Sequence, residues 1–65
     1  MKIIYDPEVD VLRIRLSDAQ VEESDEETPG VILDFDEEGQ VVGFEILNAS
    51  TRVQNPRSVE WALAA

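Results

Sequence analysis

Residues 31–47, VILDFDEEGQVVGFEIL, contain two strand-like segments on either side of an acidic turn. Every second residue from Val31 to Phe35 is apolar, and so is every second residue from Val42 to Ile46. A period of two is typical of a strand with one buried face. The pattern therefore predicts an antiparallel hairpin with this register: Val31 opposite Ile46, Leu33 opposite Phe44 and Phe35 opposite Val42.

The turn of this hairpin is predicted at Glu38 and Gly39, as a two-residue connection. Glycine adopts the positive φ that tight hairpin turns need. A shift of one residue would move every apolar side chain to the other face, so the register is strongly specified. Phe35 and Phe44 are accordingly expected on the buried face.

A second hairpin is expected near the N-terminus. Residues 11–16, VLRIRL, alternate strictly, with Arg13 and Arg15 on the face opposite the leucines and isoleucine. Residues 3–5 form a short apolar run before the turn-forming Asp6-Pro7-Glu8. With residues 7–10 as the loop, the predicted pairs are Tyr5 with Leu12 and Ile3 with Ile14.

The segments after each hairpin carry weaker signals. Residues 20–27 are mostly acidic and are read as a short edge strand that frays before Thr28-Pro29-Gly30, although a solvated loop fits the same composition. Asn55 and Pro56 resemble an N-cap and a first helical residue, which predicts a short helix over residues 58–65. Because so short a helix is unstable alone, it should dock on the sheet or on a second subunit.

The fold class that follows is α+β: one domain over residues 1–65, with an antiparallel β-meander of four to five strands in residues 1–50 and a short C-terminal helix in the tail, residues 51–65. A chain of 65 residues without cysteine has a small core and no disulfide. Small domains without such links often gain stability by self-association. A homo-oligomer is therefore expected.

Charge and composition narrow the functional classes. The chain has 15 acidic and 5 basic residues, no histidine and no cysteine, and a formal net charge of -10. It thus lacks the side chains most used for acid–base, nucleophilic and soft-metal chemistry near neutral pH. We expect no enzymatic activity, no cofactor and no nucleic-acid binding by the chain alone, because its charge repels phosphates. No segment reads as a signal peptide or membrane span, which predicts a cytoplasmic protein.

Asp34, Asp36 and Glu38, followed by Gly39 and Glu45, come close to a calcium-loop pattern, with Glu38 where Asp or Asn is usual. The hairpin register places Glu45 opposite Ile32, away from the turn, so an acidic turn explains the pattern better. No residue is assigned as a metal ligand. A divalent-cation-binding module stays as an alternative function.

An acidic run precedes the main hairpin, and two interpretations of it are open. Charges on an edge strand discourage sheet-to-sheet aggregation. The same charges attract a basic protein and orient it. The candidate partner-binding residues are Glu22, Glu23, Asp25, Glu26 and Glu27.

Several stretches together carry a family resemblance: Tyr5-Asp6-Pro7-Glu8, Leu12-Arg13-Ile14-Arg15-Leu16-Ser17, residues 29–36, residues 39–47 and Asn48-Ala49-Ser50. In this combination, the region from Met1 to Ser50 resembles the family of small bacterial proteins named domain of unknown function 2283. The family has no assigned activity and no catalytic residues to transfer. The resemblance implies an antitoxin-like role, because genes of this family often neighbour those of small toxin-like proteins with a ribonuclease-type fold.

The function predicted from the sequence is a non-enzymatic protein-interaction module, in the form of an antitoxin-like inhibitor of a basic partner protein. The alternatives are the cation-binding module and a self-assembling structural protein.

Overall fold

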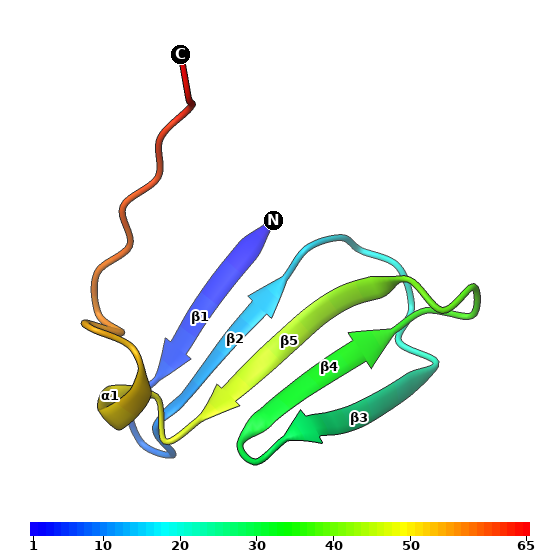
Figure 1. Cartoon of the computed structure of the whole chain (residues 1–65), viewed down its shortest axis with the longest axis horizontal. Helices are drawn as coiled ribbons and strands as arrows, with labels where there is room; N and C mark the ends of the chain where they lie inside the picture. Colours follow the sequence, from blue (N-terminus) through cyan, green and yellow to red (C-terminus); the bar gives the residue numbers. More distant parts are fainter.

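A single antiparallel sheet makes up most of the molecule in the computed structural model, which describes all 65 residues (Figure 1). The elements in chain order are β1 (Lys2–Asp6), β2 (Val11–Arg15), β3 (Glu23–Thr28), β4 (Val31–Phe35), β5 (Val41–Leu47) and α1 (Ala49–Arg52). The predicted α+β class, an antiparallel sheet of four to five strands with a short helix after it, is confirmed.

The strands lie in the order β1-β2-β5-β4-β3. An N-terminal hairpin, β1–β2, and a meander, β3–β4–β5, are joined by antiparallel pairing of β2 with β5. The central strand of the sheet is therefore the last strand in the sequence. The pairing of β2 with β5 alone joins the two halves of the sheet.

The predicted registers are confirmed in both hairpins except at one position. Tyr5 pairs with Leu12 and Ile3 with Ile14 in the first hairpin, and Val31 pairs with Ile46 and Leu33 with Phe44 in the second. The prediction for Phe35 is wrong: it pairs with Val41, because the register shifts between Asp34 and Phe35.

The side chain of Asp36 explains this shift, because it organises a longer turn than the two residues predicted. Its Oδ1 accepts hydrogen bonds from the amides of Glu38 and Gln40, both at 2.9 Å. The amide of Gly39 donates to the carbonyl of Asp36 at 3.0 Å, and the amide of Asp36 donates to the carbonyl of Gln40 at 2.9 Å. Gly39 has the expected positive φ, 78°. The result is a three-residue connection with glycine in the left-handed conformation, a common hairpin type.

The acidic run does form an edge strand, as predicted, but the strand begins at Glu23 and continues to Thr28 instead of fraying before it. β3 pairs only with β4, and all its residues are exposed. A register shift between Glu26 and Thr28 leaves Glu27 without a partner residue on β4. Pro29 and Gly30 then form the turn into β4.

The helix is not where the sequence predicted it. The prediction of a helix over residues 58–65 is wrong, because that segment is extended and leaves the sheet on the β1 side (Figure 1). The Asn55 side chain accepts the amide of Arg57 at 3.1 Å in a local turn and does not cap a helix. The observed helix, α1, begins directly after β5, where the amide of Ala49 donates to the carbonyl of Asp10 at 3.0 Å. No helix in the structure has the length and apolar character to span a membrane.

Alternation along the strands gives the sheet two different faces. We call one the apolar face; its residues are Ile3, Tyr5, Leu12, Ile14, Val31, Leu33, Phe35, Val42, Phe44 and Ile46. Of these, Leu12 and Val42 are buried, at 8% and 4% exposure, whereas Phe44 and Leu33 are only half-buried. A single sheet with one short helix thus leaves most of its apolar face partly open to water.

Candidate functional site

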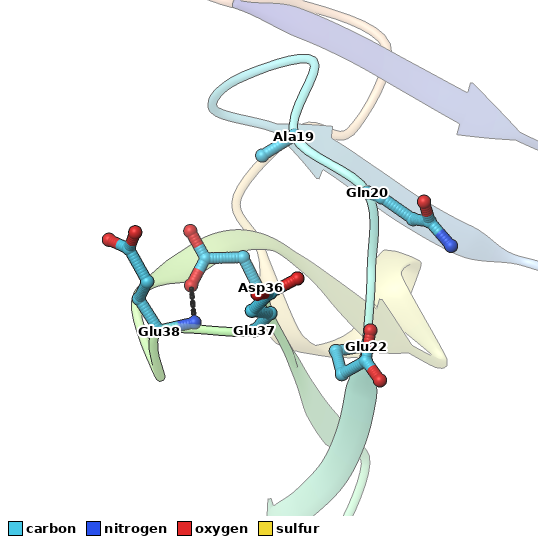
Figure 2. Close-up of a pocket in the computed structure, with 6 residues that line it drawn as sticks. All are labelled: Ala19, Gln20, Glu22, Asp36, Glu37 and Glu38. Carbon is cyan, nitrogen blue, oxygen red and sulfur yellow. Dashed lines mark hydrogen bonds between the residues drawn. The ribbon is translucent and has the colours of Figure 1, made fainter.

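Acidic side chains from two segments meet at one corner of the sheet, where β3 begins and the β4–β5 turn projects. The amide of Glu22 donates to the carbonyl of Phe35 at 2.8 Å, which continues the β3–β4 pairing and holds Glu22 beside the turn. Shallow hollows in this corner are lined by residues of both segments (Figure 2). We call this surface the acidic corner; its residues are Glu22, Glu23, Asp25, Asp36, Glu37 and Glu38.

The carboxylates of the acidic corner differ in how the fold uses them. Asp36 accepts the amides of the turn, one of which, from Glu38, is drawn in Figure 2. The carboxylates of Glu22, Glu23 and Glu37 accept no hydrogen bond within the chain, and these residues are exposed. The corner therefore combines one structural carboxylate with several that are available to a cationic partner.

The structure divides the predicted partner-binding residues into two groups. Glu22, Glu23 and Asp25 lie in the acidic corner. Glu26 and Glu27 lie at the other end of β3, where Glu26 Oε2 accepts the amide of Gly30 at 3.0 Å. The sequence prediction missed that the turn acids would join the first group, which depends on the register of β3 against β4.

The residues of the calcium-like pattern do not form a cation cage. Asp34 Oδ1 accepts the hydroxyl of Ser24 at 2.6 Å on the face opposite the apolar face. Asp36 is held in the turn, and Glu45 pairs with Arg13 opposite Ile32, as the register predicted. No group of three or more acidic residues is arranged to hold a metal ion.

The arginines of β2 are engaged within the sheet. Arg13 Nε lies 3.1 Å from Glu45 Oε1, and its Nη1 lies 3.8 Å from Asp6 Oδ2. Arg15 Nη2 donates to the carbonyl of Ala19 at 2.8 Å and not to a carboxylate. The side chains of Arg13, Asp6 and Glu45 are all partly exposed. Such partly exposed pairs each contribute about 0.2–1 kcal/mol.

A polar cluster that the sequence did not reveal joins the β1–β2 loop to α1. Asp10 Oδ1 accepts the hydroxyl of Tyr5 at 2.7 Å and the amide of Ser50 at 2.9 Å, and Asp10 Oδ2 accepts the Ser50 hydroxyl at 2.7 Å. The only sequence signal is weak: an aspartate in a hairpin loop, with a positive φ of 56°, and a serine after a strand. Contact across 40 residues cannot be read from either segment alone.

This cluster is suited to holding the fold together more than to catalysis. The hydrogen bonds from Ser50 and Tyr5 lower the pKa of Asp10 below its ordinary value of 3.8. The hydrogen bond to Asp10 raises the pKa of Tyr5 above 10.0. A carboxylate with a lowered pKa is a poor base for activating the Ser50 hydroxyl. Its role is to tie α1 to the N-terminal hairpin.

Replacing Asp10 by alanine should therefore lower the melting temperature, because three donors lose their acceptor. Asp10 has a lowered pKa when folded, so its contribution is present above the unfolded pKa and is lost as pH falls through the folded value. The wild-type protein should lose stability as the pH falls below about 4, and Asp10→Ala should lose less stability over the same pH range. Thermal unfolding against pH, with Asp18→Ala as a control, checks this. Equal melting temperatures for the two variants would contradict the structural role.

A comparison with protein families identifies the sheet region. The family model described as "Protein of unknown function (DUF2283)" matches residues 2–50. The chain belongs to this family. The DUF2283 region contains the whole sheet, the acidic corner and the Asp10–Ser50 cluster, and it ends within α1. It agrees with the resemblance seen from Met1 to Ser50.

No curated protein and no solved structure matches the chain. The tail, which carries Arg57 and Trp61, lies outside the DUF2283 region.

Proposed function

We propose that this protein is a non-enzymatic protein-interaction module whose acidic corner binds a basic protein. The observation that carries the proposal is the meeting of β3 and turn carboxylates on one exposed corner. Beside it, the outer edge of β3 has no neighbouring strand. Free backbone groups on such an edge are available to an extended segment of a partner.

Electrostatics support this choice of partner. The formal net charge is -10. Arg13 pairs with Asp6 and Glu45 of the neighbouring strands, so its positive charge is largely compensated. A surface whose charges share one sign steers oppositely charged partners toward it and raises their association rate. This attraction fades with salt, because the screening length is only about 10 Å at 0.1 M.

The specific form of the proposal is an antitoxin-like inhibitor, as the family resemblance suggests. In a ribonuclease-like partner, basic residues line the groove that receives RNA phosphates. The acidic corner would occupy that groove in place of phosphate. Inhibition would then need no chemistry from this chain, in keeping with its lack of histidine and cysteine. Location in the cytoplasm is part of the same proposal.

The test is the rate of association with the protein encoded by the adjacent gene. The variant Glu22→Gln/Glu37→Gln/Glu38→Gln should associate several-fold more slowly at low salt, and the difference should shrink at high salt.

The control Glu8→Gln/Asp18→Asn/Glu60→Gln removes the same charge from exposed positions outside the acidic corner. It should change the rate much less. Equal rates for the two variants would show that the corner itself does not guide binding, and an acidic partner would contradict the proposal outright.

A further inference from the structure

The apolar face is too open for a small protein that lacks other means of stabilisation. Only five of the 65 residues are buried, and of the apolar face only Leu12 and Val42 are among them. Ile3 is 38% exposed, and Phe35 and Phe44 are half-buried on the same face. Contiguous apolar surface of this kind marks a site of contact.

The total surface indicates how large that contact is. The chain exposes 5041 Å², whereas a folded monomer of 7.3 kDa typically exposes about 4,200 Å². The chain therefore exposes roughly 800 Å² more than a typical folded monomer of its mass, and its partly open segments include the apolar face and the extended tail. Two chains that each covered this area would bury roughly 1,600 Å², the size of a standard stable interface.

We propose that a second copy of this chain covers the apolar face, with the two sheets packed face to face. The inner strands β2, β5 and β4 present no charged side chain on this face, so a charged partner would gain no ion pair there. An identical apolar face loses no polar contact on packing and forms a self-complementary two-fold interface. Paired sheets lie about 10 Å apart and interdigitate their side chains.

Charge at the two edges of the sheet selects the direction of the two-fold axis. Glu23 and Asp25 lie on the apolar side of β3, opposite Phe35 and Leu33. At the other edge, Arg57 lies over the Tyr5 ring of β1, 5.7 Å from its centroid. An axis perpendicular to the strands would place the β3 acids of both copies together, which costs free energy.

An axis parallel to the strands avoids this repulsion. It places β3 of one copy over the β1 edge of the other, where Arg57 is, and β5 over β5. β4 then lies over the second copy's β2, so Leu33 of one copy faces Ile14 of the other. This arrangement covers the apolar face of each copy and brings the acids of β3 close to Arg57 of the other copy.

Sedimentation equilibrium of the full chain at two salt concentrations tests the proposal. The expected mass is twice 7.3 kDa at micromolar concentration. Dimerisation should strengthen with salt, because two chains of net charge -10 repel each other and salt screens the repulsion. Binding of a basic protein at the acidic corner should weaken with salt, so failure of either proposal is recognised separately.

The charged edge is tested by Arg57→Glu, which should weaken the dimer several-fold at low salt and less at high salt. The control is Lys2→Glu, which makes the same charge change on β1 but on the opposite face. Equal effects of the two variants would overturn the parallel axis.

A chain that stays monomeric at both salt concentrations would overturn the proposal itself. In that case Trp61 fluorescence identifies the occupant of the face. Trp61 is 68% exposed in the single chain. A monomer with a buried indole would show that the tail folds over the sheet.

Discussion

Replacing Phe44 by alanine should reduce the free energy of unfolding by about 3 kcal/mol at concentrations where the dimer is populated. Phe44 lies on the central strand, between Ile14 of β2 and Leu33 of β4. In the dilute monomer the ring is only half-buried, so the loss should fall to roughly half that value. A domain of this size has a total stability of only about 3–10 kcal/mol. The larger loss would therefore unfold a substantial fraction of the protein.

Denaturant unfolding of Phe44→Ala at a low and a high protein concentration measures both values. Val41→Ala is the matched control, because Val41 lies on the same strand and is 40% exposed. It should change stability by less than about 0.5 kcal/mol. No effect at Phe44 would show that the apolar face is wrongly assigned. The same loss at both concentrations would argue against a second copy over this face.

The second large effect is expected at Gly43, where the two halves of the sheet meet. A Cβ at this position would lie 2.9 Å from the carbonyl oxygen of Ile14 and 3.3 Å from Asp34 Oδ2. The carbonyl belongs to β2, so relief requires β2 to move away from β5. Gly43→Val should therefore cost about 3 kcal/mol, at the upper end for overpacking.

Amide hydrogen exchange gives the local readout for this variant. Protection should fall first along β2 and β5, the only pairing that joins the N-terminal hairpin to the meander. The control is Gly39→Ala, where nothing lies within 4 Å of the added Cβ. Its cost is limited to the left-handed backbone, about 1 kcal/mol. A larger loss at Gly39 than at Gly43 would contradict the close β2–β5 approach.

Local patterns in the sequence predict most of each hairpin. Alternation fixes which residues of β4 and β5 share a face, and hence the pairs Val31–Ile46 and Leu33–Phe44. It does not predict the pairing of Phe35, because the Asp36 carboxylate lengthens the turn through hydrogen bonds that depend on its geometry. Alternation also says nothing about which hairpin edges meet, so the pairing of β2 with β5 could not be predicted.

The helix shows how a tertiary contact overrides a local signal. Residues 58–65 have good helix formers, yet nothing in the single chain holds them in a helix. The residues of α1 have weaker signals but are held by Asp10, which accepts both the amide and the hydroxyl of Ser50. The sequence shows the intrinsic helix preference of each segment. The contact of Asp10 with Ser50, which stabilises α1, is seen only in the structure.

The candidate site was predicted only in part. Composition identified the acidic run but not the division of its residues into two groups. That division follows from the length of β3, which separates Glu26 from Glu22. The addition of Glu37 to the acidic corner depends on the hydrogen bond from the amide of Glu22 to the carbonyl of Phe35, just before β3 begins. Both are consequences of strand register.

The most direct test of the proposed self-association is an isotope-filtered NOE measurement on a mixture of labelled and unlabelled chains. Within one chain, Leu33 and Ile14 are separated by β5, about 10 Å apart. The parallel two-fold arrangement predicts strong NOEs between Leu33 methyl groups of one copy and Ile14 methyl groups of the other. NOEs between copies that involve only tail or edge residues, or none at all, would contradict a second copy on the apolar face.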